Sequence, residues 1–442
     1  MGEGPAMGRE AARSAAADAL GLRISLFFGA IYLAYGVVVP YFPVWLDARG
    51  LDPLQISTVT AAPLFVRLLV TPGVGLLADR LGNYRLVIVS LAWAALSMVV
   101  ALGFASGYWP ILLVGVAFLL SNSTMLPLVE TVAVRAVRAE GLDYGRMRLW
   151  GSVTFIVANF LGGLAIEAWG GGFALWMIML STSATIAAAH GLPRAVPGAA
   201  AGTALASGAE ARPTIAPRAL ALPRPDWRSS SPMRLLRSRL FVLFLIAIGC
   251  THGAHATFYT FGALHWRAEG LPAAWVGTLW AIGVSAEVLL FAFSAPIVRR
   301  FGPVQLIFAG AAASVVRWGA MAFDPSLALL VPLQILHALT YGAAHLGAIL
   351  FISRAVPHRG MGSAQSFYST IAAGLALGTV GLISGALYAR IGGEVFLVPA
   401  AVAAIGCAAG LFLMRGWNGQ PLWEDDEPAA APASPKAPEQ AG

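Results

Sequence analysis

The sequence predicts an all-α integral membrane protein with twelve transmembrane helices in two bundles of six. Of its 442 residues, 58% are hydrophobic and only 11% are charged, whereas soluble domains contain about 25% charged residues. A soluble globule of this length would lack the polar residues that its surface needs. Apolar runs of about 20 residues, the length that crosses a bilayer, recur along the chain. Lipid is therefore the expected solvent for most of these side chains.

A polar segment divides the apolar runs into two sets of six. The first set lies at residues 23–46, 54–77, 86–106, 109–135, 146–168 and 173–193, and the second at 240–264, 273–298, 304–323, 327–353, 361–389 and 395–415. These runs define bundles over 23–193 and 239–415, with an N-terminal tail over 1–22. Residues 194–238 and 416–442 are rich in Pro and Ala without apolar runs, so we expect a flexible linker and a disordered tail.

The arginines predict how the chain is oriented. If the N-terminus is cytoplasmic, 23 of the 28 basic residues lie on the cytoplasmic side, and only Arg49, Arg267 and Arg390 lie on the other. Basic residues concentrate in cytoplasmic loops. We therefore expect a multi-pass protein of the bacterial inner membrane with both termini in the cytoplasm.

The two halves repeat each other at an offset of 220 residues. Gly50 aligns with Gly270, and Arg80 aligns with Arg300. A parallel repeat of two six-helix halves places a substrate site near the bilayer midplane, between halves that rock about it. The sequence therefore predicts a secondary transporter that works by alternating access.

The loop after the second expected helix carries the string GLLADRLGNYR at residues 75–85. It resembles the signature of the major facilitator superfamily, Gly-x-Leu-Ala-Asp-Arg-x-Gly followed by basic residues. The resemblance implies the major facilitator fold and a gating role for Asp79 and Arg80, in which Asp79 braces the inward-closed state against the opposite half. A solvated turn is the alternative interpretation.

Glu130 and Arg148 lie equally far from the turn between the fourth and fifth expected helices, so they can face each other at similar depth. Charges inside a membrane span are costly unless they are paired or line water. A structural ion pair would explain both residues. The string YGRMRLWGS at 144–152, however, resembles lactose-permease-type proton symporters and, more closely, the phenylpropionate permease group. The lactose-type resemblance implies that Glu130 and Arg148 bind substrate and that Phe155 stacks on it.

The second half carries longer matches to the phenylpropionate permease group. They are WAIGVSAE at 280–287, RW at 317–318, LHALTYGAAHLGA at 336–348 and GALY at 385–388. In lactose-type symporters, equivalent charged groups form the proton relay. The resemblance therefore implies a proton-coupling role for Glu287, Arg317 and His337.

One departure from the lactose-type relay points to Glu287. Thr340 stands where that relay has an acid, which leaves Glu287 as the only acid inside the spans of this half. A static ion pair between Glu287 and Arg317 is the alternative. Arg67 is the repeat equivalent of Glu287 and is a further candidate for coupling.

His252, His255 and Tyr259 share one face of the seventh expected helix, and the repeat aligns the two histidines with Tyr32 and Tyr35. The first and seventh helices line the central cavity in the superfamily. The resemblance thus implies a ring of binding side chains, with plain packing as the alternative. Cys250 lies on a different side of the helix from His255, so we expect no metal site there.

Taken together, the sequence predicts a proton-coupled symporter of a small organic solute, with an aromatic carboxylate such as phenylpropionate favoured. A sugar or nucleoside symporter, an exporter of drugs or metabolites and a non-transporting solute sensor are the alternatives. No nucleophile and base set supports an enzyme, and no cofactor or nucleic acid is expected. The expected partners are the small-molecule substrate, protons and the lipid bilayer, and we expect a monomer.

Overall fold

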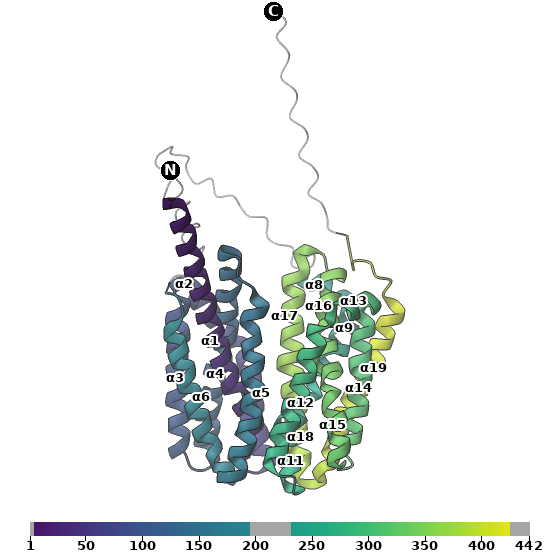
Figure 1. Cartoon of the computed structure of the whole chain (residues 1–442). Helices are drawn as coiled ribbons and strands as arrows, with labels where there is room; N and C mark the ends of the chain where they lie inside the picture. Colours follow the sequence, from purple (N-terminus) through teal and green to yellow (C-terminus); the bar gives the residue numbers. More distant parts are fainter. Residues whose placement is uncertain (1–3, 195–230, 425–442) are drawn as a thin grey trace, which may run out of the picture.

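The computed structural model describes residues 4–194 and 231–424, and this part of the chain is helical with no β-strand. The helices form two bundles that stand side by side, with the start of α1 and the end of α19 at the same end of the molecule (Figure 1). Large apolar side chains face outward, including Leu69 at 82% and Phe104 at 86% exposure. An apolar outer surface of this kind suits a lipid environment.

The first bundle contains six long helices joined by short turns. They are α1 (Gly4–Ala48), α2 (Pro53–Leu81), α3 (Tyr84–Phe104), α4 (Tyr108–Glu140), α5 (Tyr144–Trp169) and α6 (Ala174–Gly191). Asp52 caps α2 by accepting a hydrogen bond from the Gln55 amide at 2.9 Å. Gly82 ends α2 with a φ of 62°, a left-handed conformation that glycine adopts without strain.

The second bundle has more breaks within its helices. Its α-helices are α8 (Ser231–Arg237), α9 (Arg239–Gly253), α10 (His255–Thr257), α11 (Ala263–Ala268), α12 (Ala273–Ala292), α13 (Ser294–Arg300), α14 (Pro303–Met321), α15 (Leu327–Ile335), α16 (Ala344–Ala355), α17 (Met361–Thr370), α18 (Leu377–Ile391) and α19 (Leu397–Gly416). Three π-helical turns, at Phe258–Gly262, Ala338–Ala343 and Ile371–Ala376, interrupt the seventh, tenth and eleventh expected spans.

Eleven helical stretches of the described residues are long and apolar enough to cross a membrane. The last one, His358–Gly416, contains two of the expected spans, because a 3₁₀ turn at Gly392–Phe396 joins α18 directly to α19. The count is therefore consistent with the twelve expected helices.

Local structure differs from the expectation at the segments outside the bundles. α1 begins at Gly4, within the expected tail over 1–22. Residues 195–230 of the expected linker lie outside the described residues, but its end forms α8, with Leu235 buried.

The structure describes the expected C-terminal tail as far as Glu424, and residues 425–442 lie outside the described part of the chain. The Leu422 amide donates to the Ala355 carbonyl at 2.7 Å, and the Trp417 ring contacts Phe351. These apolar side chains give the start of the tail enough surface to bury against the second bundle.

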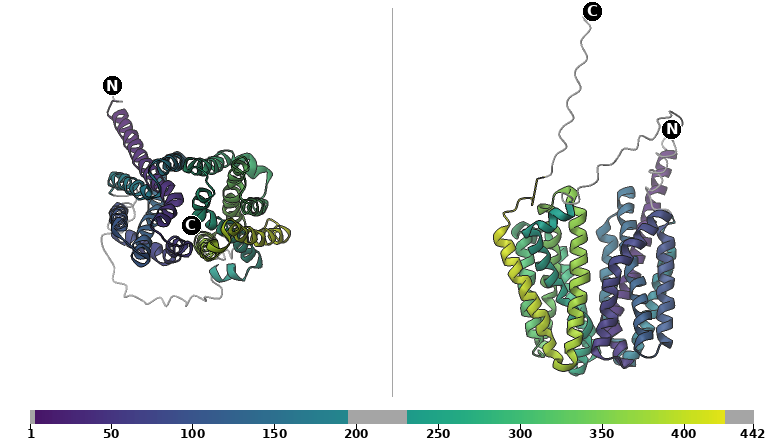
Figure 2. Two further views of the ribbon diagram at one scale, coloured as in Figure 1. Left: turned by 90° about the horizontal axis from the view of Figure 1, so that it is seen from below. Right: turned by 180° about the vertical axis from the view of Figure 1, so that it is seen from behind.

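The two bundles touch most closely at the end away from the termini (Figure 2). There α5 packs on α12 and α2 packs on α18. A Cβ at Gly163 would lie 2.5 Å from the Ala273 carbonyl oxygen, so glycine permits this close approach. The Glu167 carboxylate also accepts a hydrogen bond from the Ala273 amide at 2.5 Å. The bundles are therefore joined at this end.

Candidate functional site

A cavity of about 1000 Å³ lies between the two bundles. Its lining includes α17 residues Gly362, Gln365 and Ser366 from the end nearer the termini, so the cavity lies on the side where the bundles are not joined. Ten of the expected site residues line it: Tyr32, Tyr35, Arg67, Glu130, Arg148, Phe155, Tyr259, Glu287, Arg317 and His337. The fold brings these residues together from both halves, and their roles stay predictions.

Arg148 is held in the cavity by an aromatic partner from α1. Its guanidinium carbon lies 3.9 Å from the centre of the Tyr32 ring, and the guanidinium donates a hydrogen bond to the Tyr32 hydroxyl. A Cβ at Gly151 would lie 2.7 Å from the Tyr32 ring, so this glycine lets α1 and α5 approach. The contact combines a cation–π interaction with a hydrogen bond, and Arg148 also interacts with the Tyr144 hydroxyl.

Glu130 and Arg148 face the same cavity without forming the direct ion pair that the sequence suggested. The Glu130 carboxylate interacts with the Tyr144 hydroxyl and, through charge, with Arg148. Tyr32 binds Arg148 in place of the carboxylate. The two charges are therefore close but not neutralised by contact.

Arg67 reaches across from α2 to the other bundle. It donates to the Ala373 carbonyl at 2.8 Å, within the π-helical turn Ile371–Ala376. A π-helical turn changes the backbone hydrogen-bonding pattern, and here a carbonyl within it is bonded to Arg67. No carboxylate of the described residues lies within ion-pair distance of Arg67 or Arg148.

Glu287, His337 and Arg317 form a chain rather than the direct Glu287–Arg317 ion pair. The Glu287 carboxylate lies 3.2 Å from His337 Nε2, and Arg317 lies 3.1 Å from His337 Nδ1. Arg317 is fully buried and also donates to Thr340 at 3.1 Å and to Gln334 at 2.7 Å. The histidine therefore separates the two charges.

This geometry assigns the His337 tautomer. A guanidinium has only donors, so His337 Nδ1 must accept from Arg317 and carries no proton. The ring proton is therefore on Nε2 and is donated to Glu287. His337 is neutral in this arrangement, and it can gain a second proton only if Arg317 moves away.

His252 and His255 lie behind the cavity wall instead of joining Tyr32 and Tyr35 in a ring. His255 is fully buried and bonds Thr340 at 3.1 Å. His252 stacks on Tyr341 with ring centres 4.9 Å apart. Because Tyr341 and His337 line the cavity, the tenth span shields both histidines from it, while Tyr259 does reach the lining.

Asp79 and Arg80 lie at the end of α2, outside the cavity. Asp79 accepts a hydrogen bond from the Tyr84 hydroxyl and lies 3.4 Å from Arg135, and both partners belong to its own half. Its side chain is 56% exposed. Among the described residues, Asp79 makes no hydrogen bond or ion pair to the opposite half, and its gating role stays a prediction.

Sequence reasoning missed Trp280, Tyr341 and Gln334, which line the cavity. Trp280 Nε1 is buried and has no hydrogen-bond partner among the described residues. Trp280 and Tyr341 both fall inside the strings at 280–287 and 336–348 that carried the family resemblance. The sequence therefore contained a signal for these two residues, whereas Gln334 lies outside those strings.

Comparison with known proteins agrees with this architecture. The MFS_1 like family model matches residues 20–398. A probable 3-phenylpropionic acid transporter of Escherichia coli is 32% identical over 384 residues, covering 86% of this chain and 94% of its own. A maltose permease of Geobacillus stearothermophilus is 27% identical, covering 83% and 87% respectively.

Solved structures show the same fold. The nucleoside transporter NupG superposes with a TM-score of 0.70 at 15% identity, covering 90% of this chain and 98% of its own. A bacterial homologue of the human lysosomal transporter Spinster, in an inward-facing conformation, gives 0.62 at 14% identity, covering 90% and 95%. The chain therefore belongs to the MFS_1 like family, and it is a multi-pass membrane protein that acts as a secondary transporter.

Proposed function

We propose that this transporter carries a small aromatic carboxylate in symport with protons. The observation that carries the proposal is Arg148, whose guanidinium lies in the cavity with Tyr32 as its partner and no carboxylate within ion-pair distance in the described chain. A guanidinium binds a carboxylate through two parallel hydrogen bonds. Arg67 supplies a second such charge from α2.

The aromatic lining supports a ring-bearing solute. Phe155, Tyr259 and Trp280 line the same cavity as Arg148. Flat rings stack on aromatic side chains in offset or edge-to-face contacts. The similarity to the probable 3-phenylpropionic acid transporter points to the same class of solute.

Glu287 is the proposed proton carrier. His337 already donates its only ring proton to Glu287 and is blocked on its other side by Arg317. The Glu287 carboxylate is therefore the member of this hydrogen-bonded series that can gain and lose a proton without breaking the contact between Arg317 and His337. Protonation of Glu287 removes the negative charge that strengthens its hydrogen bond from His337 and so couples protonation to the packing of α12 against the tenth span.

We place the protein in the bacterial inner membrane as a monomer with cytoplasmic termini. In that orientation the cavity opens to the cytoplasm, because it lies on the side of the molecule that carries the chain termini, opposite the end where the bundles are joined. Asp79 and Arg80 then belong to the cytoplasmic gate, and they pair across the halves only when that side closes.

A ligand panel on the detergent-purified full chain tests the solute class. We expect 3-phenylpropionate and related aryl carboxylates to raise the melting temperature, because a ligand at a hundred times its Kd stabilises by about 2.7 kcal/mol. The matched amide, which has the ring but no charge, should stabilise far less. Equal stabilisation by acid and amide would contradict the role of Arg148.

A sugar is the second candidate, and Glu130 is the observation that favours it. Its carboxylate faces the cavity without an ion-pair partner among the described residues, and such a group accepts hydrogen bonds from sugar hydroxyls. The relative named maltose permease supports this class. Stabilisation by maltose and not by any aryl carboxylate would select the sugar over the acid.

A further inference from the structure

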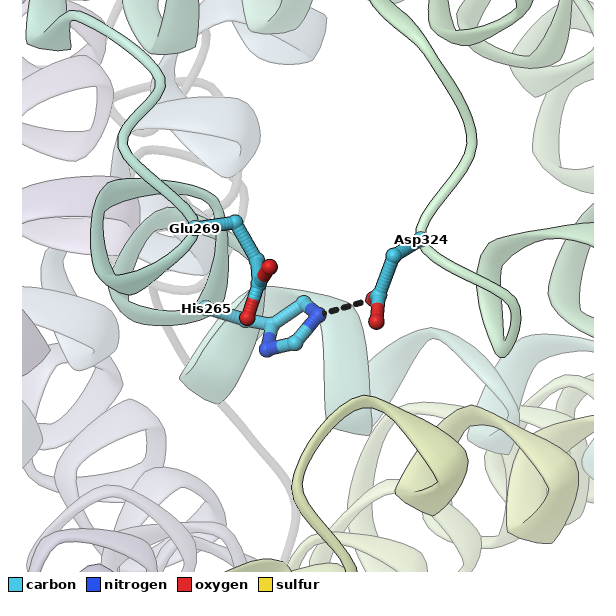
Figure 3. A group of neighbouring side chains, drawn as sticks. All are labelled: His265, Glu269 and Asp324. Carbon is cyan, nitrogen blue, oxygen red and sulfur yellow. Dashed lines mark hydrogen bonds and ion pairs between the residues drawn. The ribbon is translucent and has the colours of Figure 1, made fainter.

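A second cluster of potential ligands lies outside the transport cavity. His265 is on α11, Glu269 directly follows that helix, and Asp324 is in the connection between α14 and α15 (Figure 3). One ligand atom from each residue lies within 4.8 Å of the other two. His265 and Glu269 are four residues apart and so share a helix face, whereas only the fold brings Asp324 to them.

No arginine or lysine of the described chain balances the charge of this cluster, since none lies within ion-pair distance of Glu269 or Asp324. Asp47, from the other bundle, adds a further negative charge that acts on the neighbouring Tyr388. Grouped carboxylates without a counter-ion repel one another, so a bound cation would stabilise this end of the molecule.

The imidazole is oriented as a metal ligand requires. His265 is buried, its Nε2 lies 2.7 Å from Asp324 Oδ1, and its Nδ1 lies 3.3 Å from the Tyr388 hydroxyl. When a cation binds Nε2, the neutral ring carries its single proton on Nδ1 instead. Nδ1–H would then donate to the Tyr388 oxygen, the outer contact that metal-bound histidines usually make.

Glycine keeps the space beside the donor atoms open. A Cβ on Gly393 would lie 2.6 Å from Asp324 Oδ1 and 2.7 Å from His265 Nε2. Any other residue would therefore fill the place where the two ligands meet. Asp324 itself has a φ of 47° and is the only non-glycine residue of the described chain with a positive value.

We propose that His265, Glu269 and Asp324 bind a divalent first-row metal ion at the joined end of the molecule. One imidazole nitrogen and two carboxylates are a ligand set that suits Zn²⁺, with water in the fourth position. The site is separate from the solute cavity, since none of its three residues lines that cavity. It therefore does not depend on the identity of the solute.

Titration with Zn²⁺ tests the site on full-length protein purified through a tag without histidines. We expect calorimetry to show saturable binding of one ion per chain. Asp324→Asn keeps the side-chain shape, and asparagine tolerates a positive φ, so this variant should fold normally and bind at least tenfold more weakly. Tyr388→Phe removes the hydroxyl that accepts a hydrogen bond from His265, and loss of such a partner of a metal-bound histidine should weaken binding about tenfold.

Two further variants separate a built site from surface binding. Gly393→Ala should abolish binding, whereas Gly172→Ala, where a Cβ meets nothing within 4 Å, should leave it unchanged. Glu394→Gln removes an exposed charge near the cluster and should also bind as the parent does. Equal affinity in the parent, Asp324→Asn and Glu394→Gln chains, or no saturable binding to the parent, would overturn the proposal.

Discussion

At the scale of single residues, the polar chain around Arg317 decides where a proton can reside. Arg317 donates to His337 Nδ1 and to Thr340, and the Thr340 hydroxyl lies 3.1 Å from His255 Nε2. These contacts are compatible with two neutral histidines, although Arg317 Nε is buried without a hydrogen-bond partner among the described residues. Arg317 is buried, and no carboxylate in the described part of the chain lies within ion-pair distance of it, so these neutral acceptors stabilise its charge. Glu287 stands at the end of this chain and at the cavity.

Removing the titratable carboxylate of Glu287 should uncouple solute transport from the proton gradient. Glu287→Gln keeps the shape of the side chain and can still accept from His337 Nε2. We expect exchange of labelled for unlabelled solute to survive, while accumulation driven by a pH gradient is lost. Glu394→Gln, an exposed change, should retain both activities. Accumulation by Glu287→Gln at the parental level would assign the proton to another group.

Shortening the guanidinium at position 148 should weaken solute binding. Arg148→Lys keeps the charge but loses the planar pair of donors, and one hydrogen bond between charged groups contributes about 1.5–3 kcal/mol. We expect Kd for an aryl carboxylate to rise at least about tenfold, measured by calorimetry. Arg146→Lys, two residues away and outside the cavity lining, serves as the control. An unchanged Kd with a lowered melting temperature would make Arg148 a structural residue only.

Several residues of the cavity lining were predictable at this scale, because charges inside apolar spans stand out in the sequence. Glu130, Arg148, Glu287 and Arg317 were recognised in this way. The contacts were not predictable: Tyr32 rather than Glu130 bonds Arg148, and His337 lies between Glu287 and Arg317. The spacing of residues in the sequence predicts how deep each one lies in the membrane. Which side chains of two neighbouring helices make contact depends on their rotamers and on small residues such as Gly151.

At the scale of elements, the close packing of helices at the joined end of the two bundles depends on glycine residues. Gly163 faces the Ala273 carbonyl on α12, and Gly385 of α18 faces Ser57 of α2. Small residues let membrane helices approach and form many van der Waals contacts. The sequence showed the glycines of the eleventh span, but not which surface they would meet.

An added methyl group should weaken this end of the molecule. Gly163→Ala would place a Cβ 2.5 Å from the Ala273 carbonyl oxygen, and overpacking of this kind costs about 1–3 kcal/mol. We expect the melting temperature to fall by a few degrees. Gly172→Ala, with open space around its Cβ, should melt as the parent does. Identical melting of the two variants would show that α5 and α12 do not need this contact.

The π-helical turns were not predictable. All three lie in the second bundle, and two of them adjoin polar partners: Thr340 within one turn bonds Arg317, and Ala373 within another accepts from Arg67. A π-helical turn shifts the register by one residue within an otherwise regular helix. Hydrophobic periodicity is too coarse to reveal such a shift.

At the scale of the whole molecule, the duplication and the apolar runs predict the fold well. Two bundles meet at one end and enclose a cavity at the other, as expected for halves that rock about a central site. The tails were less predictable, because a few apolar residues such as Leu422 decide whether a polar segment packs on the bundle.

The orientation can be tested with single cysteines in a chain whose Cys250 and Cys407 are replaced by serine. Arg138→Cys lies near the C-terminal end of α4, on the same side of the molecule as the chain termini. Ser106→Cys lies in the connection before α4, on the opposite side. In intact spheroplasts we expect an impermeant maleimide to label position 106 and not 138. Labelling at 138 alone would place the termini outside the cytoplasm and reverse the proposed direction of the cavity.

Uptake of labelled 3-phenylpropionate into proteoliposomes, with and without an inward proton gradient, tests the central claim most directly. A weak acid also distributes passively with pH, so the initial rate is compared with that of protein-free liposomes and of liposomes holding Glu287→Gln. We predict that the gradient raises the initial rate in the parent above the rates of both controls, with acidification of the lumen beyond that of the two controls. An initial rate equal to that of protein-free liposomes, or a rate that is the same with and without the proton gradient, would contradict proton-coupled transport of an aromatic carboxylate.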